Sequence, residues 1–367
     1  MTVTSAAPHG DGATADSTGV VGSPGVTDST GVVAGSGVAS STGVTGSAGP
    51  PAVSAHDLVR RHRGRRGAPD VMASDHLSLE VPRGEVFGLL GPNGAGKTTF
   101  VRQLVGVLKP ESGTVHVLGH DVTGDARTAA RLVAWLAQEE PALVELPVGL
   151  AVETTARLRG VSTRDARART AELLDELGLA AVATRPMTKL SGGQRRLALV
   201  ATALVGERPL LVLDEPTAGL DPIARRLVWD ALRRRRDAVG TTVVLVTHNV
   251  LEAEALLDRV AVLDRGRVIA CDTPGRLKAA VGDDVRLDLV WRDAPYDGPV
   301  VRALQERAVV EGRRWSLRLP AAEAREALTS LTTGDALAAL DDFTLATPTL
   351  EDVYLALGGR DSDLERG

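Results

Sequence analysis

The sequence contains a single cysteine, Cys271, among its 367 residues. One thiol excludes an internal disulfide framework and a metal site built from several cysteines. Aromatic residues make up only 2% of the chain, which leaves few side chains on which nucleic-acid bases could stack. Basic residues are not in excess, because 42 Lys and Arg face 47 Asp and Glu and the formal net charge is −5. The composition therefore argues against a nucleic-acid partner.

Long apolar runs are also missing. The longest clean runs, such as Val243–Val246, have the length of a strand, and none approaches the roughly 18 apolar residues of a membrane-spanning helix. We therefore expect no membrane span in this chain. With 43% hydrophobic residues it has ample material for a core, and its length predicts about two domains.

The N-terminal stretch differs in composition from the rest. Residues 2–50 contain no Lys, Arg, Leu, Ile or aromatic residue, and a unit that opens on Ser-Thr-Gly-Val recurs at Ser17, Ser29 and Ser41. Such small residues cannot bury enough surface to offset the loss of chain entropy. We expect residues 1–52 to form a disordered low-complexity tail, which is either a tether, an extension without function or the product of a start site placed too far upstream.

A glycine-rich loop follows the first strong strand patterns. The segments Leu77–Val81 and Glu85–Leu90 are predicted strands, and a helical run from Phe100 to Leu108 comes after the loop. Strand, glycine loop and helix form the context of a phosphate-binding loop, in which backbone N–H groups converge on phosphate oxygens at a helix N-terminus. Lys97 would bring a positive charge to the β- and γ-phosphates, and the Thr98 hydroxyl would bind Mg²⁺. The loop itself reads Gly91-Pro92-Asn93-Gly94-Ala95-Gly96-Lys97-Thr98-Thr99.

Two adjacent carboxylates follow a buried strand further along the chain. The run Leu210–Leu213 is wholly apolar, as in a parallel strand covered on both faces, and it leads into Asp214 and Glu215. The carboxyl ends of such strands are where α/β folds bind ligands. Adjacent strand residues point to opposite faces, so we expect Asp214 to serve Mg²⁺ and Glu215 to polarise the attacking water.

A third motif lies between these two. It reads Leu190-Ser191-Gly192-Gly193-Gln194 and opens a helical stretch that continues through Val205. Ser191 has the place of a helix N-cap with glycine N–H groups behind it, which predicts a second anion site. Two single residues complete the set: Gln138 follows the strand-like Leu132–Ala137, and His248 closes the predicted strand Thr242–Thr247.

Together, and in this order, the motifs resemble those of the nucleotide-binding subunit of an ABC transporter. The resemblance covers about residues 53–270. In that family the motifs are the Walker A loop (here Gly91–Thr99), the Q-loop glutamine (Gln138), the signature (Leu190–Gln194), the Walker B strand (Leu210–Asp214, with Glu215), the D-loop aspartate (Asp221) and the switch histidine (His248).

The resemblance implies a mechanism and a role for each residue. Two copies of the subunit would form a head-to-tail dimer, with ATP sandwiched between the P-loop of one copy and the signature of the other. The catalytic residues would be Glu215, His248 and Gln138, and the metal partners would be Thr98, Gln138 and Asp214. The nucleotide would be held by the P-loop residues and by Ser191, Gly192, Gly193, Gln194 and Asp221.

The implied fold is α/β: a P-loop NTPase core with an antiparallel β subdomain and a helical subdomain at about residues 139–190. The pattern from Ser162, a predicted cap, to Gly178, a predicted stop, indicates a helix there. In the family, this subdomain presents a groove to a coupling helix of the membrane partner.

One position departs from the family pattern. The family usually places a Tyr or Phe near the end of the first strand to stack on adenine, and here the stretch Leu58–His62 offers His62. An imidazole can stack, with less area than a tyrosine ring. Alternatively, Arg60 or Arg61 would cover the base through a cation–π contact, or the basic stretch would simply be solvated.

Regular patterns continue beyond about residue 275, where the motifs end. Val285–Trp291 and Trp315–Leu319 alternate as strands do, and Ala321–Leu331 is a predicted helix. They indicate a small α+β accessory domain. Pro348–Leu357 resembles the C-terminal segment of ATPases in the daunorubicin-resistance-like branch of type-2 ABC exporters, although an amphipathic closing helix would show the same pattern. The predicted domains are therefore 1–52, 53–274 and 275–367.

The combined prediction is an ATP-binding and ATP-hydrolysing subunit that powers a multicomponent exporter of drugs or antibiotics. It would lie at the cytoplasmic face of the cell membrane, with a second copy of itself and a separate permease as partners. A soluble ABC ATPase of DNA repair, chromosome maintenance or translation is the alternative; one cassette, no long coiled coil and no basic excess speak against it. Glu215 and His248 speak against an ATP-binding module without hydrolysis.

Overall fold

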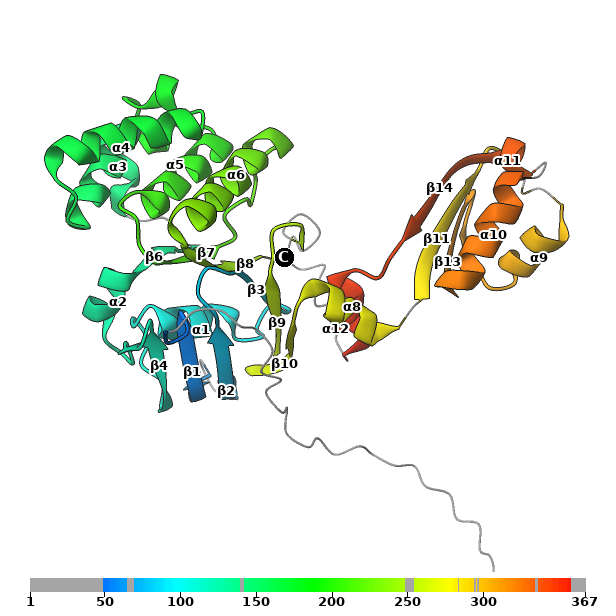
Figure 1. Cartoon of the computed structure of the whole chain (residues 1–367), viewed down its shortest axis with the longest axis horizontal. Helices are drawn as coiled ribbons and strands as arrows, with labels where there is room; N and C mark the ends of the chain where they lie inside the picture. The colour runs from blue at the N-terminus through cyan, green and yellow to red at the C-terminus, as the bar shows by residue number, and fades with distance from the viewer. Residues whose placement is uncertain are drawn as a thin grey trace, which may run out of the picture. The chain divides into compact units, whose positions relative to one another are not determined.

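The computed structural model describes residues 49–64, 69–138, 142–247, 254–282, 284–293, 295, 297–333 and 336–357 (Figure 1). Its central element is a six-stranded sheet in the order β10-β9-β3-β8-β7-β6. The strands β9, β3, β8, β7 and β6 are parallel, and β10 pairs with β9 in the antiparallel sense. Their bounds are β3 Val86–Leu90, β6 Val133–Leu136, β7 Leu210–Asp214, β8 Thr242–Val246, β9 Arg259–Asp264 and β10 Arg267–Asp272.

Both faces of this sheet are buried, which explains why its strands read as continuous apolar runs. Along β7, Leu211 and Leu213 face one hydrophobic core, whereas Leu210 and Val212 face another. The first core lies under the helices α3 Val148–Leu158, α4 Thr163–Glu176, α5 Gly192–Leu204 and α6 Pro222–Val239. The short helix η2 Ala142–Glu145 precedes α3, and η3 Ala180–Val182 and η4 Met187–Lys189 lie between α4 and α5.

The second core lies between the central sheet and an antiparallel sheet in the order β2-β1-β4-β5. This layer also contains Phe100 and Val101 of α1. The bounds are β1 Val53–His62, β2 Val71–Val81, α1 Lys97–Leu104, β4 Ser112–Val117, β5 His120–Asp121 and α2 Ala126–Leu132. Figure 1 shows the helical layer and the antiparallel sheet on opposite sides of the central sheet.

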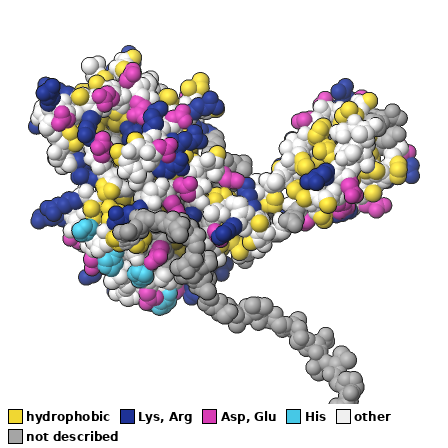
Figure 2. All heavy atoms as spheres, viewed as in Figure 1, with side chains coloured by type: hydrophobic (Ala, Val, Ile, Leu, Met, Phe, Trp, Pro, Cys, Tyr) yellow, Lys and Arg dark blue, Asp and Glu magenta, His cyan; other side chains and the backbone are white. Residues whose placement is uncertain are grey.

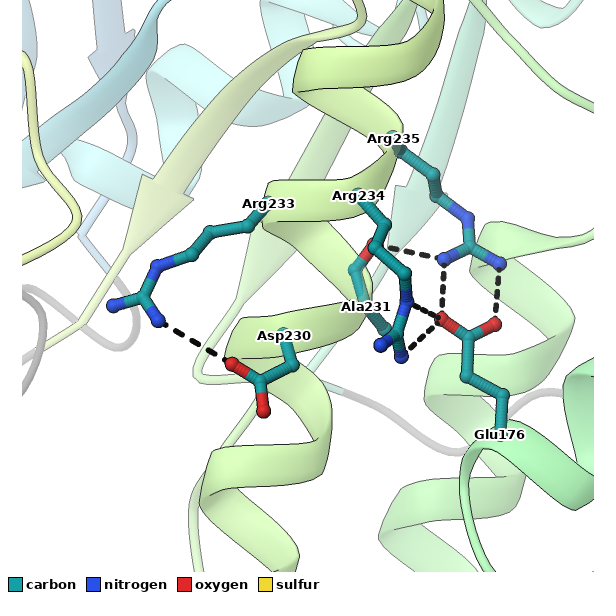
Figure 3. A network of polar contacts seen from close by, with 6 residues as sticks. All are labelled: Glu176, Asp230, Ala231, Arg233, Arg234 and Arg235. Carbon is teal, nitrogen blue, oxygen red and sulfur yellow. Dashed lines mark hydrogen bonds and ion pairs between the residues drawn. The ribbon is translucent and has the colours of Figure 1, made fainter.

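Two side-chain contacts tie the helical layer together. Glu176 at the end of α4 accepts hydrogen bonds from Arg234 (2.8 Å) and Arg235 (3.1 Å) of α6 (Figure 3). Arg159, just after α3, donates to the carbonyl oxygens of Ala203 (2.8 Å) and Val205 at the end of α5. Burial lowers the pKa of Arg159 to about 10, with a smaller effect from Arg208. The contacts of Glu176 thus join α4 to α6, and those of Arg159 join the end of α3 to the end of α5, the helix that begins at the signature motif.

The central sheet, the helical layer and the antiparallel sheet are together called the cassette below. A separate α+β unit follows it in the chain. Its sheet has the order β12-β13-β11-β14, with Trp291 and Trp315 in an edge-to-face contact at 5.2 Å in its core. The bounds are β11 Asp284–Trp291, α9 Pro299–Gln305, β12 Val309–Glu311, β13 Arg314–Pro320, α10 Ala321–Thr333, α11 Ala336–Ala339 and β14 Leu340–Ala346. With this unit and the two subdomains, the predicted fold class is confirmed.

The final described helix does not belong to the core of that α+β unit. Leu350, Val353 and Tyr354 of α12 (Leu350–Ala356) are at most 5% exposed and join the core of the cassette. There they pack with α8 (Pro274–Val281), whose Leu277 is in the same core. The predicted domain divisions at residues 52 and 274 stay predictions.

The surface of the described part mixes both signs of charge. Figure 2 shows basic and acidic side chains interspersed over the helical layer, and histidines gathered over the antiparallel sheet. Among the described residues, no helix has both the length and the hydropathy to cross a membrane.

Candidate nucleotide site

The predicted phosphate-binding loop connects β3 to α1, and two of its glycines cannot be replaced without moving the backbone. Gly91 has φ +142° and Gly96 has φ +103°, conformations that favour glycine. A Cβ atom on Gly91 would lie 2.2 Å from the carbonyl oxygen of Leu263, and one on Gly96 would lie 2.2 Å from that of Ala73. The loop is therefore pressed against two neighbouring strands, which fixes the direction of its amides.

Lys97 begins α1, and its ammonium lies within the loop. Its Nζ donates to the carbonyl oxygens of Gly91 (2.5 Å) and Pro92 (2.8 Å). Burial lowers the pKa of Lys97, and the charges of Glu215 and Asp214 partly offset this effect. The loop thus holds a partly desolvated positive charge beside the two carboxylates.

Asp214 is the last residue of β7 and only 4% exposed. Burial raises the pKa of its carboxyl group and the charge of Glu215 raises it further, while Arg196 and Lys97 act in the opposite direction. A buried carboxylate of this kind is favoured in its charged form when a cation lies nearby.

Glu215 lies beyond the strand, with φ +52°. This left-handed backbone is uncommon outside glycine, and strand alternation therefore does not decide where Glu215 points, contrary to the premise of the sequence argument. Its amide donates to the carbonyl oxygen of Val246 (2.8 Å), and the Thr247 hydroxyl donates to its carboxylate (3.3 Å).

A cavity of about 770 Å³ brings most of the predicted residues together, and its size is that of a small-molecule site. The predicted residues that line it are His62, Gly91, Pro92, Asn93, Gly94, Gly96, Lys97, Thr98, Thr99, Gln138, Gly192, Asp214 and Glu215. Ala95 is not among them, because its side chain is buried in the second core, and the predicted residues Ser191, Gly193, Gln194 and Asp221 do not line this cavity either. Sequence reasoning missed other lining residues, namely Val71, Ala73, Arg195, Arg196, Leu199, Ala218, Gly219 and Val246.

The signature motif forms the start of α5. Ser191 accepts a hydrogen bond from the amide of Gln194 (3.3 Å), and the Gln194 side chain accepts one from the amide of Ser191 (3.4 Å), which completes a capping box. Ser191, Gly192 and Gln194 are exposed, and Gly193 is half-buried. Asp221 caps α6 by accepting from the amides of Ile223 and Ala224, both at 2.9 Å, and is exposed as well.

His62 ends β1 and lies beside the P-loop. Its Nε2 is 3.1 Å from the hydroxyl oxygen of Thr99, and its ring lines the cavity. Its predicted contact with a nucleotide base stays a prediction. The predicted switch histidine, His248, lies outside the described residues.

The residues of the cavity fit a nucleoside triphosphate. Gly91 and Gly96 leave room where a Cβ would collide with backbone, and the partly desolvated Lys97 donates its hydrogen bonds to the carbonyl oxygens of Gly91 and Pro92. Backbone amides and a lysine at a helix N-terminus are the groups that bind phosphates. The fold and the cavity thus define a P-loop ATPase of the ATP-binding-cassette type.

Comparisons with known proteins agree with this class. The ABC transporter family model matches residues 74–218, and a model of the ABC transporter C-terminal domain matches residues 284–347. The daunorubicin resistance ATP-binding protein DrrA3 of Streptomyces coeruleorubidus is 42% identical over 80% of this chain and 93% of its own length. The daunorubicin/doxorubicin resistance ATP-binding protein DrrA of Streptomyces peucetius is 39% identical over 85% and 94%.

Solved structures are similar in fold. The ATP-binding subunit of an ABC transporter aligns with a TM-score of 0.56 at 27% identity, over 62% of this chain and 92% of its own. The cassette MJ0796, in a dimeric post-hydrolysis state bound to ADP and Pi, aligns with a TM-score of 0.56 at 24% identity, over 60% and 98%. The chain belongs to the ATP-binding subunits of ABC transporters, in the branch of the daunorubicin resistance ATP-binding proteins, and it is an ATPase.

Proposed function

We propose that this chain is the ATP-hydrolysing motor of a multicomponent exporter and acts on a separate permease at the cytoplasmic face of the cell membrane. The observation that carries the proposal is the single cavity in which the P-loop, Gln138, Asp214, Glu215 and the start of the signature helix meet. Glu215 lines this cavity together with the P-loop, and a site that only stored nucleotide would have no need of such a carboxylate.

Magnesium fits the donor set of this cavity. Thr98, Gln138 and Asp214 line it with hydroxyl, amide and carboxylate oxygens, the hard ligands that Mg²⁺ takes together with water. A cation would also favour the charged form of Asp214 and so offset the effect of burial, which raises the pKa of this carboxyl group. When bound, it neutralises charge on the β- and γ-phosphates during transfer.

The chain's own residues supply the rest of the chemistry. The Lys97 ammonium would leave the carbonyls of Gly91 and Pro92 for phosphate oxygens, while the P-loop amides hold the phosphates in line. Glu215 would accept a hydrogen bond from the attacking water and orient it. Gln138 and His248 would complete the site, as the family resemblance implies.

Two copies are needed for the complete site in this proposal. Ser191 and Gly192 are exposed at the N-terminus of α5, where amides and the helix dipole favour an anion. Ser191 does not line the cavity of its own copy, and in this proposal it binds the γ-phosphate held by the P-loop of a second copy, so that ATP joins the two. Asp221, exposed at the start of α6, would face the partner as well.

In this proposal the permease, and not this chain, provides the path for the transported molecule. Two relatives are named for daunorubicin or doxorubicin resistance, and another, the Nod factor export ATP-binding protein I of Mesorhizobium japonicum, is 38% identical over 79% of this chain and 83% of its own. We therefore propose export, with drugs or antibiotics as the cargo class.

The first test is the variant Glu215→Gln, which removes the charge of the carboxylate and keeps its shape. It should bind ATP as the wild type does but lose at least about 100-fold in turnover, because general-base catalysis is worth roughly that much. With ATP it should elute as a dimer in size-exclusion chromatography with light scattering. Turnover at the wild-type rate would contradict the role of Glu215.

The second test concerns the permease. The purified chain should sediment with membranes only when its permease partner, tested as a candidate six-span membrane protein, is co-expressed, and the pair should protect a drug-sensitive host. Glu215→Gln paired with the same permease is the matched control, since it should sediment but not protect. Sedimentation with permease-free membranes to the same extent would argue against this partnership.

A further inference from the structure

Arg196 lies between the signature motif and the two carboxylates. It is in the second turn of α5, five residues after the N-cap Ser191, and its side chain lines the nucleotide cavity. Its Nη2 donates to the main-chain carbonyl oxygens of both Asp214 and Glu215, each at 2.5 Å. One guanidinium group therefore joins the signature helix to the end of β7 within a single copy.

The backbone that Arg196 holds is strained. Glu215 has φ +52°, which a non-glycine residue keeps only where its surroundings enforce it. Its amide is held by the carbonyl of Val246 (2.8 Å) from β8. Its carbonyl accepts hydrogen bonds from Arg196 and from the amide of Ala218 (3.1 Å) in the turn that follows. The amide of Glu215 is thus held by β8 and its carbonyl by Arg196 together with this turn, and the residue lines the cavity.

The contact is strong and electrostatically directed. Charge-assisted hydrogen bonds are stronger than neutral ones, and more so where water is excluded. Burial lowers the pKa of the Arg196 guanidinium, and the carboxylates of Asp214 and Glu215 act against this effect. The Nε of Arg196 is buried without a hydrogen-bond partner. One donor of the guanidinium group thus stays unsatisfied while Nη2 keeps its two contacts with carbonyl oxygens.

We propose that Arg196 is a positioning residue for hydrolysis, because it holds Glu215 in its left-handed conformation. The direction in which the Glu215 carboxylate points would then depend on the position of the signature helix α5. The inference rests on the proposed role of Glu215. Since Ser191 would meet the nucleotide of the second copy, a shift of α5 on dimerisation would pass through Arg196 to the catalytic carboxylate of the same copy.

The test compares Arg196→Gln and Arg196→Lys with Arg131→Gln, a change of the same kind at an exposed position of α2. Arg196→Gln should lower kcat by about tenfold or more, with KM for ATP and the Kd of the fluorescent analogue MANT-ATP within about twofold of the wild type. Arg196→Lys keeps a charged donor and should recover part of kcat. Arg131→Gln should match the wild type.

A double variant separates positioning from general damage. If Arg196 acts through Glu215, the variant Arg196→Gln/Glu215→Gln should hydrolyse ATP as slowly as Glu215→Gln alone, within about twofold. A further loss in the double variant would overturn the proposal, because Arg196 would then act by another route. A rise in KM and Kd as large as the fall in kcat would also overturn it, because Arg196 would then bind nucleotide.

The proposed function and this inference fail differently. Wild-type turnover by Glu215→Gln would remove the role of Glu215 itself, whatever Arg196 does. Loss of turnover in Glu215→Gln, together with wild-type kcat in both Arg196→Gln and Arg196→Lys, would leave the proposed function standing and overturn the inference alone. Melting curves of the full chain show whether each variant is folded. If Arg196→Gln does not fold, Arg196→Lys is compared with the wild type instead.

Discussion

Lys97 is a residue whose interactions we expect to change when nucleotide binds. Its ammonium now bonds to two carbonyls of its own loop, Gly91 and Pro92, and burial lowers its pKa. Phosphate oxygens would replace dipoles by full negative charges, which is worth considerably more in a partly desolvated site. The affinity for a triphosphate should therefore depend strongly on this one charge.

We predict that Lys97→Ala lowers the affinity for MANT-ATP by about 10- to 100-fold, the value of a charged hydrogen bond to phosphate. Fluorescence titration measures the affinity, and circular dichroism shows whether the fold is kept. The stabilisation of the wild type by ATP in thermal melts should disappear in the variant. An affinity within twofold of the wild type would show that the loop amides alone hold the phosphates.

At the residue scale, the sequence predicted those parts of the site that are contiguous in the chain. Gly91–Thr99 and Asp214–Glu215 could be found because each motif carries its own local geometry. Arg196 could not, because its partners are 18 and 19 residues away and an arginine can point in many directions. The left-handed backbone of Glu215 has no sequence signal either.

At the scale of elements, apolar runs and caps carried most of the information. The strand Leu210–Asp214 and the helix after Ser162 occur where the pattern predicts them. The helix predicted from Phe100 to Leu108 spans Lys97–Leu104 instead. Gly96, with its positive φ, serves as N-cap and starts the helix earlier than apolar spacing suggests.

The hydrogen bonds between α4 and α6 depend on one carboxylate, that of Glu176. Glu176 is bonded by both Arg234 and Arg235, and Arg235 also donates to the carbonyl of Ala231 at 2.8 Å (Figure 3). Burial acts to raise the pKa of Glu176, but the hydrogen bonds and charges of the two arginines outweigh it and lower the pKa. A lowered pKa means that the folded state favours the ionised form, so this contact stabilises the fold above the ordinary value of 4.5.

We predict that Glu176→Gln lowers the free energy of unfolding at pH 7 by about 1 kcal/mol, the upper range for partly exposed pairs. Urea unfolding from pH 7 downward should show the difference from the wild type shrinking as the pH falls below 4.5, where the unfolded state becomes protonated, and disappearing below the lowered pKa of the folded state, where the carboxylate is protonated in both states. The control is Glu172→Gln, which removes an exposed charge one turn earlier on α4. A loss that does not depend on pH would point to packing instead.

At the scale of the whole molecule, two segments that pack together are far apart in the chain. The α+β unit is inserted between α8 and α12, and these two helices pack on each other and on the core of the cassette. The sequence predicted a closing helix at Pro348–Leu357 but not its place, because an amphipathic pattern shows that one face is buried and not what covers it. That place decides which part of the chain the cassette needs in order to fold.

We therefore predict opposite outcomes for two deletions. A chain that ends at Val281 loses Leu350, Val353 and Tyr354, which are 1%, 1% and 5% exposed, and each such burial contributes roughly 1.5–3 kcal/mol. Its cassette should melt at a clearly lower temperature than the full chain or aggregate. A chain in which about ten Gly and Ser residues replace residues 283–347 keeps α12, and such a linker spans roughly 17 Å.

This second variant should melt near the full chain and keep its affinity for MANT-ATP, because α8 and α12 are in contact and only the inserted unit is gone. Leu350→Ala in the full chain is the matched point change, expected to cost about 2–5 kcal/mol. Equal melting temperatures for the two deletions would show that α12 contributes nothing to the cassette. The expected difference would instead mean that α12, which follows the accessory unit in the chain, completes the cassette, so that the two cannot be separated by cutting the chain once.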